Sequence, residues 1–388
     1  MDNHQSIHDD LAALEEEGLT RSLRTLQESG GKIEWNGKPY LNFSSNDYLN
    51  LANDPRLKAG AIRAIEEFGC GATASRLMAG HLAVHETLER AIADWLNMDC
   101  GLVFPSGFQA NLGMISSIVG KADTVFSDTL NHASIVDGCR LSGADIRIYR
   151  HLDCDHLEEL LQSTESSGRK LIVTDSVFSM DGDCAPIKRI AELAQEYECL
   201  FAVDEAHALG VFGEGKGLCH GLSVQPDIIV GTMTKSFGSG GGFIASSTSF
   251  QSLFINKARS FIFSTGLSPA CAGSALAATD VMQQNPSMGV ELLRKSRLLR
   301  DRLIESGVQI PDDDSQILPI MIGSNAEAVR IMNTLLDHGI LLAAVRPPSV
   351  PEGTARLRIS VTLAHEDSDL EYAATTIAQV LQSSGVHS

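Results

Sequence analysis

Short apolar runs alternate with longer polar stretches of helical spacing through the middle of the chain, from about residue 55 onward. Five of the runs have the length of buried strands. They are residues 101–104, 124–126, 171–173, 200–203 and 228–230. Repeated strand, turn and helix patterns are typical of a mostly parallel sheet with helices on both faces. The pattern therefore predicts an α/β fold.

Each of these runs is followed at once by small or polar residues. The residues that follow are Pro105-Ser106-Gly107, Ser127-Asp128, Thr174-Asp175-Ser176, Asp204 to His207, and Gly231 to Lys235. In parallel α/β sheets, ligands bind outside the carboxyl ends of the strands, where helix N-termini also gather. We therefore expect the reactive side chains of this chain to converge on one edge of the sheet.

The N-terminal region has a different pattern. Residues 7–26 alternate apolar and charged positions at helical spacing until Gly30 and Gly31, which predicts a helix that leads into an arm. Asn36-Gly37 lies inside residues 35–41 and indicates a small hairpin. We assign residues 1–50 to this helix and arm.

The C-terminal part predicts a second, smaller unit. Two helical stretches act as a connector, and three segments with strand or helix patterns follow them. The connector stretches are 270–282 and 292–303, and the later segments are 316–322, 326–338 and 356–361. With a boundary near Asn285-Pro286, the predicted organisation is a large α/β domain at 51–287 and a small C-terminal α+β domain at 288–388.

Charge and composition exclude several classes of protein. The 388 residues carry 30 Lys and Arg against 49 Asp and Glu, so the net charge of -19 disfavours general binding to nucleic acid or anionic membranes. The acidic N-terminus does not fit a secretory signal, and no apolar run is long enough to cross a bilayer. The eight cysteines form no CxxC motif. We therefore expect a cytoplasmic protein with reduced thiols and no bound metal.

Lys235 is the first candidate for chemistry. It follows an apolar strand and precedes a glycine-rich stretch, Ser236 to Gly242, where backbone and ligand can approach closely. This position suits a lysine that holds a carbonyl cofactor as a Schiff base. A surface lysine before a flexible loop explains this segment alone equally well.

Asp204 is the second candidate, because it ends a buried strand and is followed by Glu205-Ala206-His207. A carboxylate in a low-dielectric site can keep a ring nitrogen protonated. A protonated pyridine nitrogen is what makes pyridoxal 5′-phosphate (PLP) an electron sink. The alternative for an isolated aspartate is a helix N-cap. The 31 residues from 204 to 235 allow one helix and one further strand, so both side chains reach the same sheet edge.

Four further features fit the same chemistry, each with an ordinary structural alternative. The backbone N–H groups of Gly107 and Phe108 at a helix start could bind phosphate, or form a simple βα turn. His132 could face a planar ring, or be structural. Ser179 could bond the cofactor, or cap a turn. Arg358, which shares a strand face with Arg356, could clamp a carboxylate, or lie on a solvated edge.

Together these segments resemble the α-oxoamine synthase family of PLP-dependent enzymes, through nearly the whole chain from Tyr40 to His365. The matching segments are Tyr40 to Leu49, Ser106-Gly107-Phe108, Asn131 to Ser134, Ser176 to Asp183, Asp204 to His207 and Thr232 to Lys235. The resemblance implies a fold-type I PLP-dependent transferase and an acyl transfer to the α-carbon of an amino acid. The stretch from Arg346-Pro347-Pro348 to Arg358 resembles members that condense L-alanine with a pimeloyl thioester of coenzyme A or a carrier protein.

The resemblance also implies roles for individual residues. Lys235 would form the Schiff base, Asp204 would pair with the pyridinium nitrogen and His132 would stack on the ring. The other cofactor-binding residues implied are Gly107, Phe108, Ser179, His207 and Thr232, with Ser264 and Thr265 reaching the phosphate of a neighbouring subunit. The substrate-binding residues implied are Arg21, Asn46, Ser349 and Arg358. A homodimer with shared active sites follows from these roles.

Three alternatives remain open at this stage. Another α-oxoamine synthase, such as a glycine C-acetyltransferase or a long-chain acyl-serine synthase, would use the same lysine, aspartate and histidine. A PLP aminotransferase would instead need a 2-oxo acid and would release no carbon dioxide. A non-catalytic protein that kept the PLP fold is the third reading.

Overall fold

The computed structural model describes residues 3–27, 29–165 and 167–385, and the chain divides into two compact units. The large unit contains Asp47–Ser179 and Asp183–Glu291. The small unit contains the residues up to Asn46, Met180–Gly182, and the chain from Leu292 onward. This grouping does not test the predicted division into an arm at residues 1–50 and domains at 51–287 and 288–388, which stays a prediction.

A seven-stranded sheet forms the centre of the large unit. Its strand order is β3-β9-β8-β7-β6-β4-β5. The strands are β3 (Cys100–Phe104), β4 (Thr124–Asp128), β5 (Asp145–Tyr149), β6 (Lys170–Asp175), β7 (Leu200–Asp204), β8 (Ile228–Thr232) and β9 (Gly242–Ser246). Only β9 runs antiparallel to its two neighbours, β3 and β8. The prediction of a mostly parallel sheet is thus confirmed, and all five predicted runs are strands.

Two strands of this sheet were not predicted. β5 is an edge strand whose Asp145 and Arg147 are exposed, so it lacks the apolar run that identifies a buried strand. β9 begins at Gly242, at the end of the glycine-rich stretch that follows Lys235. The glycine content of this region alone predicts a loop.

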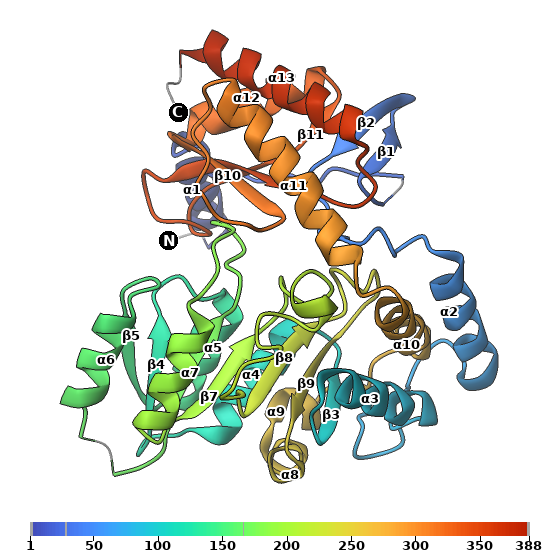
Figure 1. The fold of residues 1–388 in the computed structure, drawn as a ribbon, viewed down its shortest axis with the longest axis vertical. Coiled ribbons are helices and arrows are strands. Elements are labelled where there is room, and N and C mark those ends of the chain that lie inside the picture. Colours follow the sequence, from blue (N-terminus) through green and yellow to red (C-terminus); the bar gives the residue numbers. More distant parts are fainter. Residues whose placement is uncertain (1–2, 28, 166, 386–388) are drawn as a thin grey trace. The chain divides into compact units, whose positions relative to one another are not determined.

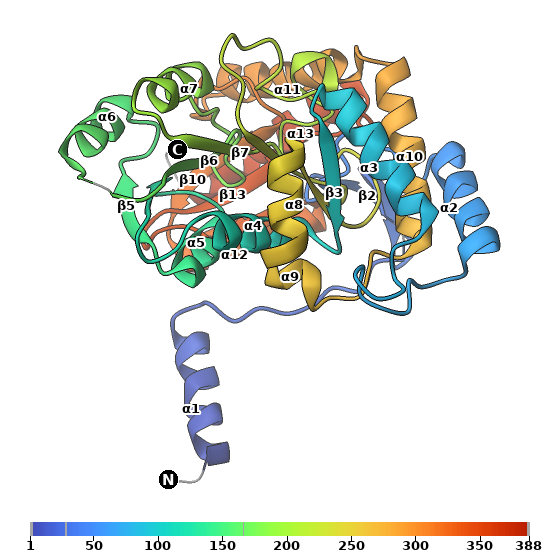
Figure 2. The same cartoon turned by 90° about the horizontal axis from the view of Figure 1, so that it is seen from below.

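Helices cover both faces of the sheet. The helices of the large unit are α2 (Pro55–Phe68), α3 (Ala83–Leu96), α4 (Gly107–Ile118), α5 (Ala133–Ser142), α6 (Cys154–Ser163), α7 (Ile187–Glu196), α8 (Thr248–Lys257), α9 (Arg259–Ile262) and α10 (Pro269–Gln284). Figure 2 shows α4 and α5 on one side of the strands and α6 and α7 on the other. Met114 and Ile118 of α4 pack with Val125, Val173 and Ile244 of the sheet in the main core. This packing places the N-terminus of α4 at the carboxyl edge of the strands.

The small unit holds two three-stranded sheets and the long C-terminal helices (Figure 1). One sheet joins β1 (Lys32–Trp35), β2 (Lys38–Asn42) and β11 (Ile340–Leu341). The other joins β10 (Ile317–Gly323), β13 (Ala355–Ser360) and β12 (Ala343–Val345). Its helices are α1 (Asn3–Glu16), α12 (Asn325–Asp337), α13 (Asp367–Ser384) and most of α11 (Met288–Glu305). Strands and helices of this kind match the predicted C-terminal segments.

The N-terminal predictions have mixed outcomes. The predicted hairpin is confirmed, because Asn36 and Gly37 form a two-residue turn with φ of 51° and 72°, as a type I′ turn requires. The predicted helix over residues 7–26 is wrong beyond Glu16. Gly18 takes a φ of 66°, and Leu19 N donates to Leu14 O at 2.8 Å, which ends the helix with a left-handed glycine.

None of the helices that the structure describes is long and apolar enough to cross a membrane.

Candidate active site

A cavity of about 220 Å³ lies in the large unit where β6, β7 and β8 end and α4 and α5 begin. Its lining residues are Ser106, Gly107, Phe108, Asn111, His132, Ser134, Asp175, Asp204, Ala206, His207, Thr232, Thr234 and Lys235. Seven of them were predicted as site residues from the sequence. These seven are Gly107, Phe108, His132, Asp204, His207, Thr232 and Lys235.

The two principal candidates arrive from adjacent strands. Asp204 is the last residue of β7 and pairs in register with Val230 of β8, while Lys235 lies three residues beyond the end of β8. Asp204 Oδ2 accepts a hydrogen bond from Asn111 Nδ2 at 2.6 Å, and Oδ1 accepts one from Ala206 N at 2.8 Å. Two donors therefore orient the Asp204 carboxylate in a cavity that Lys235 also lines.

A second aspartate lies beside Asp204. Asp175 ends β6 and stands opposite Asp204 in the parallel β6–β7 register. Burial, together with the negative charge of Asp204, raises the pKa of Asp175 well above its usual range. One carboxylate of such a close pair takes up a proton more readily than the other. The protonated form of Asp175 is therefore favoured in the cavity.

His132 begins the turn into α5. Its backbone N donates to Asp175 Oδ2 at 2.7 Å, and its Nδ1 lies 2.8 Å from Ser134 Oγ. The ring meets Phe108 edge to face, with centroids 6.4 Å apart and planes at 77°. Burial, with the positive charge of Lys235 acting in the same direction, lowers the pKa of His132. A neutral imidazole is thereby favoured at the cavity wall.

His207 is held by an aromatic partner. Its Nδ1 lies 2.6 Å from the hydroxyl of Tyr48, and both side chains are buried. Tyr48 belongs to the segment Tyr40 to Leu49 that carried part of the sequence resemblance. The cavity-facing position of His207 thus depends on a residue 159 positions away in the chain.

The end of the cavity at the start of α4, where the sequence predicts phosphate binding, has the helix N-terminus and hydroxyl groups that an anion site needs. We call it the phosphate end. Ser106 Oγ accepts from Gln109 N at 3.2 Å, so α4 begins at the cavity with Gly107 and Phe108 in its first turn. A Cβ built on Gly107 would lie 3.2 Å from Thr232 Cβ, so a larger residue would narrow this end of the cavity. Thr232 Oγ1 lies 2.8 Å from Thr234 Oγ1, which places two hydroxyls beside the helix start.

The remaining predicted cofactor residues lie outside the cavity lining. Ser264 Oγ accepts from Gln109 Nε2 at 3.1 Å, and Thr265 pairs with Ser75 in an isolated bridge. Ser179 is half-buried in the loop after β6. All three belong to the large unit.

The four predicted substrate residues belong to the small unit. Arg358 donates to Asn46 Oδ1 at 3.1 Å and to Ser360 Oγ at 2.8 Å, so the structure brings two of the four together. Arg21 donates to Pro347 O at 2.8 Å, which places it beside the turn that contains Ser349. Arg356, on the same strand as Arg358, makes an ion pair with Asp181 instead.

Sequence reasoning missed six of the lining residues, which are Ser106, Asn111, Ser134, Asp175, Ala206 and Thr234. Asn111 stands one turn after Gly107 on α4, so helical spacing from the glycine was an available signal. Asp175 ends its strand as Asp204 does, but its role depends on β6 being the neighbour of β7. The order of strands in the sheet is not a local property of the chain.

The lining fits PLP. A lysine, a carboxylate, an imidazole and a helix N-terminus with two hydroxyls match the aldehyde, ring nitrogen, ring face and phosphate of this cofactor. In addition, Asn111 donates to both Asp204 and Ser134 Oγ, while its buried Oδ1 has no hydrogen-bond partner among the residues described. The donor and acceptor set is therefore arranged around Asp204, where the ring nitrogen would bind.

Comparisons with known proteins agree with this chemistry. The family model for aminotransferase class I and II matches residues 38–377. An 8-amino-7-oxononanoate synthase from Lysinibacillus sphaericus is 43% identical over 381 residues, which cover 97% of this chain and 98% of that protein.

Two solved structures share the fold. A serine palmitoyltransferase from S. paucimobilis with a bound PLP–myriocin aldimine has a TM-score of 0.92 and 29% identity, and the match covers 98% of both chains. An 8-amino-7-oxononanoate synthase from Francisella tularensis has a TM-score of 0.77 and 25% identity, covering 89% of this chain and 99% of that one. On this similarity and on the cavity that holds Lys235, Asp204 and His132, the chain belongs to the α-oxoamine synthases, a PLP-dependent, acyl-transferring family.

Proposed function

We propose that this chain is an 8-amino-7-oxononanoate synthase of biotin biosynthesis. It would condense L-alanine with a pimeloyl thioester of coenzyme A or a carrier protein, and would release carbon dioxide and the free thiol. Relatives that carry this name match the chain from end to end. The observation that carries the proposal is the single cavity lined by Lys235, Asp204 and His132.

When bound, PLP supplies an electron sink for the negative charge that develops at Cα of the amino acid. Lys235 would hold the cofactor covalently and, once released, its Nζ would take the Cα proton as a general base. The Asp204 carboxylate would keep the ring nitrogen protonated. Asn111 and the N–H of Ala206 hold that carboxylate in place, so it need not reorient during the reaction.

His132 and the phosphate end would fix the plane of the cofactor. The His132 backbone is tied to Asp175 and its ring to Ser134, so the imidazole face is held rigidly at the cavity wall. The first turn of α4 with Thr232 and Thr234 would bind the phosphate. Ser179 and His207 would contact the phenolic oxygen side of the ring.

Arg358 would bind the amino-acid carboxylate through its guanidinium, which is a geometry suited to a two-point contact. Asn46 already accepts a hydrogen bond from this guanidinium and would set its direction. Holding the carboxylate orients Cα for proton removal and for attack on the thioester carbonyl. Arg21 and Ser349, near the turn at Pro347, would line the path of the acyl chain.

We further propose a cytoplasmic homodimer with shared active sites. The bridge between Ser75 and Thr265 joins two segments whose apolar side chains Met78 and Phe263 are 82% and 70% exposed. If a second copy of the chain covered these side chains, Ser264 and Thr265 of each copy would lie near the phosphate site of the other copy. The free state of all eight cysteines supports a reducing compartment.

The test of the activity is product analysis with the purified holoenzyme. L-Alanine with pimeloyl-coenzyme A is expected to give 8-amino-7-oxononanoate by mass spectrometry and one carbon dioxide per thiol released. Absence of that product, with carbon dioxide released from another pair of substrates, would overturn the proposal.

A serine palmitoyltransferase activity is the second candidate, because solved structures of that name have TM-scores up to 0.92 against this chain. The same assay separates the two. Serine with palmitoyl-coenzyme A, and glycine with acetyl-coenzyme A for a glycine C-acetyltransferase, are offered beside alanine with pimeloyl-coenzyme A. The pair with the highest kcat/KM identifies the enzyme.

A further inference from the structure

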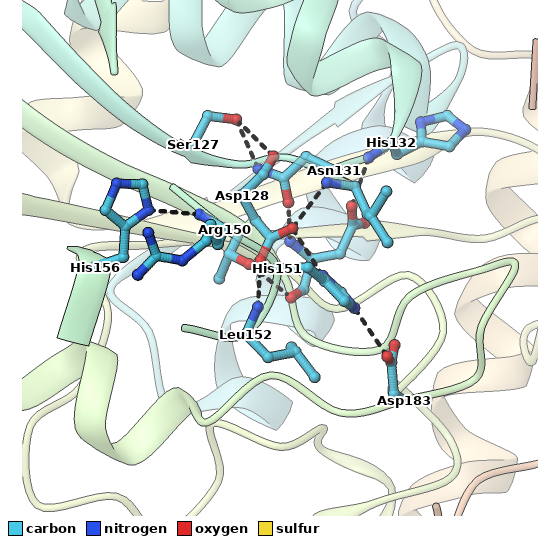
Figure 3. A network of polar contacts seen from close by, with 12 residues as sticks. Ser127, Asp128, Asn131, His132, Arg150, His151, Leu152, His156 and Asp183 are labelled. Atoms are coloured by element: carbon cyan, nitrogen blue, oxygen red, sulfur yellow. Dashed lines mark hydrogen bonds and ion pairs between the residues drawn. The ribbon is translucent and has the colours of Figure 1, made fainter. Parts of the chain in front are cut away.

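A histidine outside the cavity lining is bonded on both sides by carboxylates. His151 Nδ1 lies 2.9 Å from Asp128 Oδ1, and His151 Nε2 lies 2.8 Å from Asp183 Oδ2 (Figure 3). Neutral imidazole can donate only one hydrogen bond, whereas the protonated ring donates two. Two carboxylate partners therefore require an imidazolium. We call Asp128, His151 and Asp183 the imidazolium clamp.

The charge state agrees with this geometry. Burial opposes the charge, but the hydrogen bonds and charges of Asp128 and Asp183 outweigh it and raise the pKa of His151 to about 10. The Asp128 side chain is 1% exposed, and that of Asp183 is 15% exposed. The neighbouring Arg150 on the same turn pairs with Asp153 instead. The clamp therefore stays charged throughout the usual assay range.

One arm of the clamp holds the turn that presents His132. Asp128 is the last residue of β4, and its carboxylate also accepts from Leu130 N at 2.8 Å and Leu152 N at 3.0 Å. Asn131 continues this turn and donates to Val173 O at 2.9 Å. The chain then reaches His132, four residues after Asp128.

The other arm holds the loop that carries Ser179. Asp183 O accepts from Phe178 N at 3.0 Å, and Val177 pairs with Cys184 in a bridge, so Asp183 lies at the base of this loop. The ring of Phe178 meets the His151 ring edge to face, with centroids 4.5 Å apart. The other carboxylate oxygen of Asp183, Oδ1, is buried and has no hydrogen-bond partner among the described residues. The Asp183 carboxylate is therefore held at the clamp through the bond between its Oδ2 and His151.

We propose that His151 is a positioning residue of the cofactor site, which ties the turn presenting His132 to the loop carrying Ser179. The proposal rests on the proposed function only in placing those two side chains at PLP. Without the imidazolium, the Asp183 carboxylate loses its partner and the loop loses its side-chain connection to β4. The predicted consequence is weaker and less ordered cofactor binding in a chain that still folds.

The test measures PLP affinity of the apoprotein by fluorescence quenching, cofactor order by visible circular dichroism, and folding by thermal melting. His151→Gln places an amide oxygen against one of the two carboxylates, and we expect about tenfold or more weaker PLP binding with a reduced visible dichroic band. Adding Asp183→Asn to His151→Gln lets the two amides bond each other without charge, so PLP affinity is expected to recover in part. His220→Gln, at an exposed histidine of the same unit, is the control.

Recovery in the double variant is a result that a packing role for the ring would not produce. The proposal is overturned if His151→Gln binds PLP within about twofold of wild type, or if the double variant binds no better than His151→Gln alone. Should His151→Gln fail to fold, Asp183→Ala alone decides in the same way, since it removes the carboxylate that His151 Nε2 bonds. Each readout is independent of the product formed. A wild-type enzyme that made a different product would refute the proposed function and leave this comparison intact.

Discussion

Asn111 Nδ2 lies 2.6 Å from Asp204 Oδ2, so a side chain in the first turns of α4 orients the carboxylate at the end of β7. The same amide nitrogen donates to Ser134 Oγ at 2.9 Å. One residue thus connects the helix that begins at the phosphate end, the acid proposed for the ring nitrogen, and the helix that follows His132. This connection links the start of α4 to the carboxylate of Asp204 and to Ser134 through two hydrogen bonds of one side chain.

We predict that Asn111→Ala weakens PLP binding and lowers kcat by about 10- to 100-fold, because a hydrogen bond to a charged group is worth about 1.5 to 3 kcal/mol. Ser116→Ala, on the same helix and bonded only to Leu112 O among the contacts described, is the matched control. PLP titration and steady-state kinetics on both variants provide the measurement. Equal kinetics for the two variants would show that Asn111 does not support Asp204.

Lys235→Ala is expected to abolish covalent attachment of PLP and to reduce turnover by at least about 10²- to 10⁴-fold, since both the anchor and the general base are lost. Borohydride reduction followed by peptide mapping locates the attachment in wild type. Lys257→Ala, at an exposed lysine, is the control and is expected to retain both. A reduced pyridoxyl group found on another lysine would remove Lys235 from the mechanism.

Asp204→Asn is expected to fold and to lose most of its catalysis. The amide keeps the shape of the side chain but no longer favours a protonated ring nitrogen. The visible spectrum with L-alanine should change in the variant while its thermal midpoint stays near that of wild type. Turnover at the wild-type level would contradict the role proposed for this carboxylate.

Arg358→Lys should raise KM for L-alanine by about tenfold or more with a smaller effect on PLP affinity, because a point charge cannot reproduce a bidentate contact. Arg356→Lys is the comparison on the same strand, since Arg356 pairs with Asp181. It is expected to affect thermal stability rather than KM for L-alanine. If both lysine variants change KM alike, the carboxylate site does not depend on Arg358.

Acid should destabilise the large unit through His85. This side chain is 0% exposed, accepts from Leu82 N at 3.1 Å and bonds Leu267 O at 2.7 Å, and burial lowers its pKa to about 4. The unfolded chain takes up this proton near pH 6.5, so the stability that His85 contributes is complete above that pH and is lost as the pH falls towards 4. The linked loss is about 3 kcal/mol.

Urea unfolding at several pH values between 7 and 4 measures this effect. His85→Gln should show a shallower fall in stability with decreasing pH than wild type, even if it is less stable at pH 7. His220→Gln should follow the wild-type slope. Parallel curves for wild type and His85→Gln would assign the acid sensitivity to other groups.

Several features of the site are local and were readable in the sequence. Apolar runs that end at Asp204 and shortly before Lys235 predict strand tips, and parallel strands place their tips on one edge whatever their order. The glycine at 107 after a strand predicts a helix start. The main elements of the large sheet and five residues of the cavity lining, Gly107, Phe108, His132, Asp204 and Lys235, followed from such local signals, whereas His207 and Thr232 were implied by the family resemblance.

By itself, then, the sequence determined which residues end buried strands, and hence which groups could meet a cofactor. Tertiary structure alone decided which groups are neighbours. Burial raises the pKa of Asp175, and Asp204 adds to this effect because β6 lies next to β7. The pKa of His151 is raised because Asp128 and Asp183 converge on it from positions 23 and 32 residues away. Charge and hydrogen bonding act across short distances in space, and those distances are set by strand order and loop paths that no local pattern of residues encodes.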